Sequence, residues 1–189
     1  MNAKKDGEPK PTKNRTTVEP KSEREVVVTR TFDAPARIVF QAWTTPALFK
    51  RWWVPKSMPL ALLSYEADIR AGGGYRLVFD VDGTKTMAFF GKYLEVTPHS
   101  RIVWTNDESG EDGAVTTVTL EEKGDTTLLV LHELYRSKEV RDAALASGAY
   151  DGMGETFGQL DEVLVTLGAK GQRREIPARR SRAAGQGHR

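Results

Sequence analysis

The chain of 189 residues is 39% hydrophobic and 29% charged, the composition of an ordinary globular protein with room for one domain and a buried core. It has no cysteine, which excludes disulfides, thiolate zinc sites and cysteine nucleophiles. No apolar run approaches the roughly 18 residues that a membrane span needs, and residues 1–19 lack the apolar core of a secretory signal, so we expect a cytoplasmic protein.

The net charge of +2 conceals two basic ends and an acidic middle. Residues 1–24 hold seven Lys or Arg against four Asp or Glu, and residues 168–189 hold seven against one. Residues 25–167 hold 14 against 21, so we expect no specific nucleic-acid binding by this part. Because both ends are polar and poor in residues to bury, they are predicted to be disordered tails around one folded domain, 25–167.

The predicted domain begins with a strand and two helices. Val26-Val27-Val28 and Phe32 indicate a strand over 25–33. Asp33, followed by Ala34-Pro35, predicts the N-terminal cap of a helix that runs to about Thr44. Pro46 then begins a second short helix, on which three aromatic residues fall at i, i+3 and i+4: Phe49, Trp52 and Trp53.

Strands follow, recognised by apolar residues at every second position. Leu63 and Tyr65 are predicted to share an inward face on the first of them, and Asp82-Gly83 predicts a two-residue hairpin turn. An acidic loop is predicted over 107–113, and a second hairpin turns about Gly124-Asp125. The predicted strands cover 62–69, 75–80, 87–96, 101–105, 114–120 and 126–134.

The end of the domain is predicted to be helical. Ser137 is placed to cap a short helix through Ala146, with Gly148 as an interruption. A longer helix is predicted from about Ala149 to Leu167, with Gly168 as the stop that follows it. Its apolar stripe is Met153, Phe157, Leu160, Leu164 and Leu167. This order of elements predicts an α+β fold, with a curved antiparallel sheet of six to seven strands wrapped on the last helix.

Several short motifs along this order belong together. They are Phe32-Asp33-Ala34-Pro35, Trp43, Trp52-Trp53, Gly73-Gly74-Tyr75-Arg76, Gly91, Pro98-x-x-Arg101-Ile102 and Gly152-Met153-x-x-x-Phe157. In this combination the chain resembles the helix-grip superfamily (SRPBCC, START-like), in the branch of homologues of the activator of heat-shock-protein-90 ATPase. The resemblance implies a sheet closed over a C-terminal helix with an apolar cavity between them, and it implies no particular ligand or reaction.

Ten residues are predicted to line that cavity. Large apolar side chains dominate protein cores, so the alternative is that these residues simply fill the space between sheet and helix. Their number and type fit a mostly apolar ligand site with few polar groups. The residues are Trp43, Trp52, Tyr75, Phe79, Phe89, Trp104, His132, Met153, Phe157 and Leu160.

His132 and Glu155 are the candidates for acid–base chemistry. His132 is in phase with Leu128 and Val130 on its strand, which predicts an inward side chain, and Glu133 is then expected on the opposite face. No partner completes a catalytic triad, so a structural histidine is the alternative. The sequence shows no set of metal ligands and no cofactor motif.

Three functional hypotheses follow. The favoured one is a non-enzymatic binder of a small apolar or amphipathic molecule in the cavity. The second is an enzyme of the cyclase or hydrolase type found in the same superfamily, with His132 or Glu155 as the acid–base group. The third is a co-chaperone-like module that binds a protein partner, or a second copy, through an exposed apolar patch around Trp52-Trp53.

Overall fold

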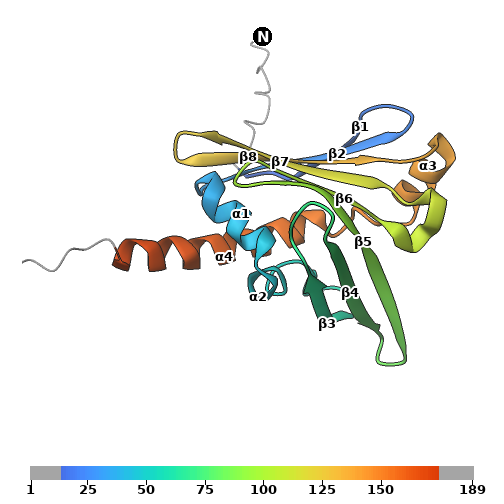
Figure 1. The fold of residues 1–189 in the computed structure, drawn as a ribbon, viewed down its shortest axis with the longest axis horizontal. Helices are drawn as coiled ribbons and strands as arrows, with labels where there is room; N and C mark the ends of the chain where they lie inside the picture. Colours follow the sequence, from blue (N-terminus) through green and yellow to red (C-terminus); the bar gives the residue numbers. More distant parts are fainter. Residues whose placement is uncertain (1–13, 175–189) are drawn as a thin grey trace, which may run out of the picture.

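An eight-stranded antiparallel sheet curves around the C-terminal helix in the computed structural model, which describes residues 14–174. The strand order is β1-β2-β8-β7-β6-β5-β4-β3. Figure 1 shows β3, β4 and β5 bent away from β1, β2, β7 and β8, with helix α4 running along the hollow between them. The strands are β1 Thr17–Pro20, β2 Glu25–Phe32, β3 Leu60–Ala67, β4 Gly74–Val81, β5 Lys85–Thr97, β6 Arg101–Thr105, β7 Val115–Lys123 and β8 Thr126–Leu134.

Helices occupy three places along the chain. Two follow β2, two follow β8, and a short 3-10 helix connects β6 to β7. They are α1 Ala36–Thr44, α2 Pro46–Phe49, η1 Asp107–Asp112, α3 Lys138–Ala146 and α4 Met153–Arg174. The predicted α+β helix-grip architecture is therefore confirmed, with eight strands where six to seven were expected.

The ends of two helices are set by local hydrogen bonds. Ser137 caps α3 as predicted, because its side chain accepts a hydrogen bond from the Val140 N–H at 3.3 Å. The prediction that Asp33 caps α1 is wrong, since Pro35 holds that position and makes no side-chain cap. The free N–H of Ala36 instead donates to Glu122 Oε2 at 2.7 Å, so a carboxylate from β7 satisfies the helix start.

The folded part extends beyond the predicted limits of 25 and 167. At its start, β1 pairs antiparallel with β2, with Thr17 opposite Thr29. At its end, α4 continues through Gly168 to Arg174. A single glycine costs a helix only about 1 kcal/mol relative to alanine, so it need not end one. Residues 1–13 and 175–189 of the predicted tails lie outside the described residues.

A β-bulge corrects the predicted inward face of β3. The pairing of β3 with β4 shifts between Leu62 and Ser64, so Leu63 is the extra residue. Leu63 is consequently 55% exposed, whereas Tyr65 is buried as predicted.

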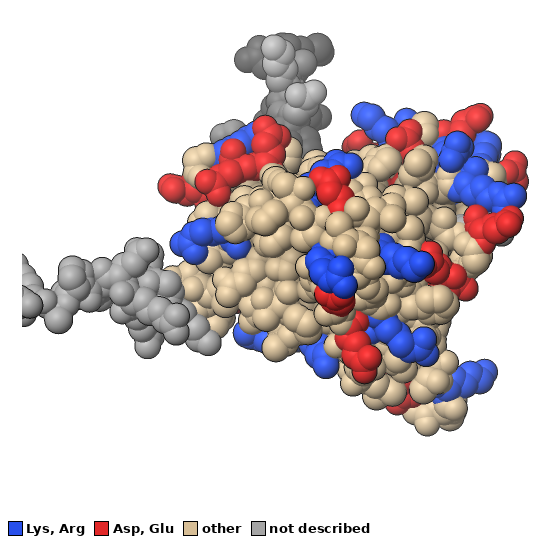
Figure 2. All heavy atoms as spheres, in the orientation of Figure 1, with Lys and Arg blue, Asp and Glu red and all other residues tan. Residues whose placement is uncertain are grey.

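The core lies between the concave face of the sheet and the helices α1 and α4. Phe157 of α4 is fully buried and meets Phe32 of β2 edge to face, with ring centroids 5.6 Å apart. On the face of the molecule shown in Figure 2, acidic and basic side chains are interspersed. Within residues 14–174, no helix combines the length and apolar character needed to cross a membrane.

Candidate functional site

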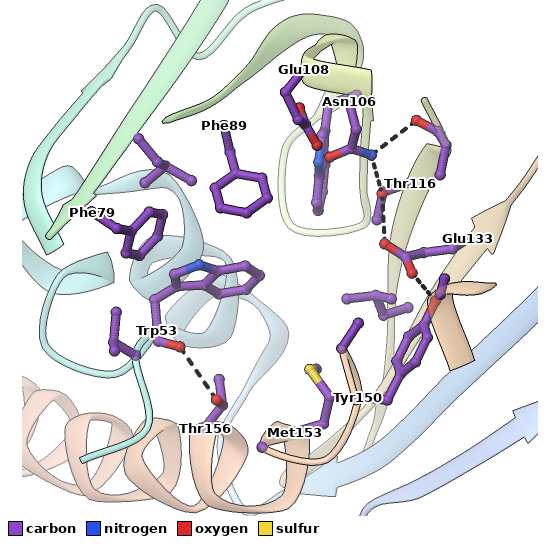
Figure 3. Close-up of a pocket in the computed structure, with 18 of the residues that line it drawn as sticks. Trp53, Phe79, Phe89, Asn106, Glu108, Thr116, Glu133, Tyr150, Met153 and Thr156 are labelled. Atoms are coloured by element: carbon purple, nitrogen blue, oxygen red, sulfur yellow. Dashed lines mark hydrogen bonds between the residues drawn. The ribbon is translucent and has the colours of Figure 1, made fainter. Parts of the chain in front are cut away.

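A cavity of about 770 Å³ lies between the bent sheet and the start of α4. Figure 3 shows its two ends, an apolar end around Trp53, Phe79 and Phe89 and a polar end around Asn106 and Glu133. Strands β3 to β8 form one part of the wall, and α1, α2 and the loop that leads into β3 form another. The connection from β6 to β7 and the segment from α3 to the first turn of α4 complete it.

Aromatic side chains form most of the apolar end, and we call this group the aromatic wall. Its members contact one another in pairs: Phe49 stacks on Trp53 with centroids 4.7 Å apart, and Phe79 meets Phe89 edge to face at 5.5 Å. Such pairs add about 0.5–1.5 kcal/mol beyond the area they bury. The aromatic wall consists of Trp43, Phe49, Trp53, Tyr65, Tyr75, Phe79, Phe89, Tyr93 and Trp104.

The tandem tryptophans after α2 have different roles. Trp52 has no exposed surface, and its indole N–H donates to the Ala42 carbonyl at 3.1 Å. That carbonyl belongs to the last turn of α1, where the residue four positions later is Pro46 and has no N–H to offer. Trp52 therefore closes the end of α1, while Trp53 turns towards the cavity (Figure 3).

Glu133 of β8 is the centre of the polar end. Its Oε1 accepts a hydrogen bond from Thr116 Oγ1 at 3.2 Å, and its Oε2 accepts one from the Tyr135 hydroxyl at 2.9 Å. The Tyr150 hydroxyl, from the segment between α3 and α4, also donates to Oε2. Three donors from β7, the end of β8 and the α3–α4 segment thus hold one carboxylate in place.

Asn106 extends this network towards the aromatic wall. Its Nδ2 donates to the Ala114 carbonyl at 2.9 Å and to Thr116 Oγ1 at 2.8 Å, which fixes the orientation of the amide. Its Oδ1 accepts from the Tyr75 hydroxyl at 3.2 Å. A continuous chain of hydrogen bonds therefore runs from Tyr75 through Asn106 and Thr116 to Glu133.

The polar end favours neutral tyrosines and a less acidic Glu108. Burial, and next the negative charge of Glu133, raises the pKa of both Tyr135 and Tyr150, so their hydroxyls stay protonated and donate. Burial is also the main cause that raises the pKa of the Glu108 carboxyl, and the charges of Asp107 and Glu133 add to it. No three His, Asp or Glu side chains within residues 14–174 are arranged to hold a metal ion.

Six of the ten residues predicted for the cavity lie on its wall, and four do not. Trp52, Phe157 and Leu160 are fully buried in the core instead. Phe157 and Leu160 share the stripe of Met153, but only the first turn of α4 reaches the cavity because the later turns pack against α1 and the sheet. The six are Trp43, Tyr75, Phe79, Phe89, Trp104 and Met153.

The prediction that His132 points into the cavity is wrong. Its Nε2 lies 2.7 Å from Glu25 Oε1, on the face of β8 opposite to the cavity. Leu129 and Leu131 face the core, and the alternation of side chains then brings Glu133 to the cavity.

Glu155 also lies outside the cavity. It is in the first turn of α4, where its Oε1 accepts the Ser57 N–H at 2.9 Å and its Oε2 accepts the Ser57 hydroxyl. These bonds tie the loop before β3 to the helix. The same bonds, the one from the Ser57 hydroxyl first, lower the pKa of Glu155.

Sequence reasoning missed the polar end as a whole. Its five residues come from four separate segments, and only the fold brings them together: Asn106, Thr116, Glu133 with Tyr135, and Tyr150. A signal was present at Glu133, since it is a carboxylate in a strand whose central residues, Leu128 to Leu131, are all apolar.

Comparison with known proteins assigns the chain to a family. A family model described as activator of Hsp90 ATPase homolog 1-like protein matches residues 33–165. A search of curated proteins finds no match.

Solved structures share the fold. A protein from Nitrosomonas europaea is 24% identical with a TM-score of 0.71, over 79% of this chain and 99% of that one. A protein from Rhodobacter sphaeroides is 23% identical with a TM-score of 0.72, over 81% and 99%. A third, from Chromobacterium violaceum, is 26% identical with a TM-score of 0.63, over 74% and 96%. Since the family model covers most of the chain, the protein belongs to the family of activator of Hsp90 ATPase homolog 1-like proteins, within the helix-grip superfamily.

Proposed function

We propose that the protein binds a small amphipathic molecule in the cavity between the sheet and α4. The observation that carries this proposal is the volume of about 770 Å³ that the side chains leave open. Ligand sites typically have about 300–1,000 Å³, mostly apolar walls and a few polar groups that orient the ligand. The apolar body would lie along the aromatic wall, and the polar group would meet Glu133 and its neighbours.

The two rival hypotheses find less support in the geometry. His132 and Glu155, the residues named for acid–base chemistry, both lie outside the cavity, so that assignment of an enzymatic site has no basis in their positions. An exposed apolar patch at the tandem tryptophans is also not formed, because Trp52 is fully buried and Trp53 faces the cavity.

Two neighbouring phenylalanines of β5 allow a matched test. Phe89 lies on the cavity wall, whereas Phe90 is 39% exposed on the other face of the same strand. The assay titrates the full chain with N-phenyl-1-naphthylamine, a neutral apolar probe whose fluorescence rises in apolar surroundings. We expect saturable binding at a single site, weakened about fivefold or more by Phe89→Ala because contact area is lost.

Phe90→Ala is the control and should leave the dissociation constant unchanged. Absence of saturable binding to the unmodified chain would contradict the proposal. Equal weakening by Phe89→Ala and Phe90→Ala would also contradict it, because the probe would then not distinguish the cavity from the outer face.

A further inference from the structure

The charged groups inside the cavity all have the same sign. Among the described residues that line it, Glu108 and Glu133 are the only ones with a carboxyl group, and none is Lys, Arg or His. An anionic head group entering the polar end would lie near two carboxyl groups without a cation to offset the repulsion. A cationic group would meet attraction at the same place.

We propose that the ligand of this cavity carries a protonated amine, which binds the Glu133 carboxylate while its apolar body lies along the aromatic wall. This inference rests on the proposed function and specifies the chemical class of the molecule.

The hydrogen bonds of Glu133 leave room for a further donor. A carboxylate offers about four lone-pair sites, and three are used by Thr116, Tyr135 and Tyr150. The three hydroxyl donors fix the carboxylate before a ligand arrives, so binding an ammonium group requires little reordering. A hydrogen bond between two charged groups is about twice as strong as a neutral one.

The remaining walls also suit a cation. The faces of aromatic rings carry partial negative charge and attract an ammonium group within about 6 Å. Trp53, Tyr75 and Trp104 place such rings on the cavity wall. Glu108 supplies a second negative group at the polar end (Figure 3). Part of the rise in the pKa of Glu108 comes from the charge of Glu133, after burial as the main cause, and a cation at the polar end would offset that repulsion.

The test compares three molecules with one apolar body and different head groups. Decylamine and decanoate, each below its micellar concentration, and decanol, below its solubility limit, compete with N-phenyl-1-naphthylamine for the full chain at pH 7.5. We expect decylamine to bind at least about tenfold more tightly than decanoate, with decanol between them. Glu133→Gln, which removes the charge and nearly keeps the shape, should abolish this preference for the amine.

Glu121→Gln is the matched control, because Glu121 is exposed on β7 beside Lys123. The substitution changes the net charge of the chain by the same amount as Glu133→Gln. It should preserve the preference for the amine. If Glu133→Gln does not fold, the ratio of decylamine affinity to decanoate affinity in the unmodified chain still tests the amine preference. Glu108→Gln then serves as the second variant, with an expected severalfold drop in that ratio.

The outcomes separate the two proposals. Decanoate binding as tightly as decylamine, or an amine preference that survives Glu133→Gln, would overturn the assignment of an amine. Displacement of the probe by none of the three molecules would overturn it as well, while the cavity would still bind apolar compounds. Only a failure of N-phenyl-1-naphthylamine itself to bind would contradict the proposed function.

Discussion

The tandem tryptophans should differ sharply when each is replaced by phenylalanine. Trp52→Phe removes part of a fully buried side chain together with the indole N–H that donates to the Ala42 carbonyl. Trp53→Phe shortens a side chain that borders an open cavity, so little new void is created. We therefore expect a large loss of stability from the first substitution and a small loss from the second.

The magnitude for Trp52→Phe has two parts. The volume difference leaves a void of about 40 Å³, which at about 24 cal/mol per Å³ lowers the free energy of unfolding by about 1 kcal/mol. The Ala42 carbonyl loses its donor, and an unsatisfied buried group costs about 1–3 kcal/mol more. The total is about 2–4 kcal/mol, against less than about 1 kcal/mol for Trp53→Phe.

Urea unfolding followed by far-ultraviolet circular dichroism measures both variants without relying on the tryptophan signal. Equal m-values would show that the midpoints report stability alone. Two results would contradict the different roles of the tryptophans. One is a Trp53→Phe variant that loses as much stability as Trp52→Phe. The other is a Trp52→Phe variant within about 0.5 kcal/mol of the unmodified chain, the spread usual for a neutral surface substitution.

Three further substitutions test the packing, a helix cap and a carboxyl group. A Cβ on Gly91 would lie 1.9 Å from the Thr105 carbonyl oxygen, so Gly91→Ala should cost about 3 kcal/mol or more in urea unfolding; an unchanged midpoint would contradict the close contact of β5 and β6. Ser137→Ala removes the cap that the Val140 N–H uses and should cost about 1 kcal/mol, whereas Ser137→Gly should cost only a few tenths. Burial raises the pKa of the Glu108 carboxyl above its ordinary value of 4.5, so the folded chain binds a proton at this group more readily than the unfolded chain does. The protonated group therefore favours the folded state at low pH, and this stabilisation is lost as the pH rises through the folded pKa. Glu108→Gln should therefore stabilise the protein by at most about 1 kcal/mol at pH 8 and have almost no effect at pH 4, and a larger gain at pH 4 would show that the sign is wrong.

The fold could be predicted from the sequence because its signals are local. The strand β8, the hairpin about Gly124-Asp125 and the Ser137 cap each depend on a few adjacent residues, and the structure confirms them. The limits of the domain were harder to predict, since β1 has only four residues and depends on its pairing with β2. Gly168 weakens a helix without ending it.

The apolar end of the cavity was largely predictable, and the polar end was not. Aromatic residues on the concave face follow from strand alternation, as for Phe79 and Phe89. On β8, however, both alternating sets contain at least two apolar residues, so periodicity cannot decide between His132 and Glu133 as the inward residue. The structure decides it through Leu129 and Leu131, whose burial places Glu133 in the cavity.

The most direct test of ligand binding in the cavity uses methionines as internal reporters. Three of the four methionines of the chain line it: Met58, Met87 and Met153. Methyl-labelled protein titrated with N-phenyl-1-naphthylamine should show saturable shifts of these three methyl resonances, because the aromatic rings of a bound probe alter the field at nearby methyl groups. Methyl resonances that stay unchanged at saturating probe would contradict binding between the sheet and α4.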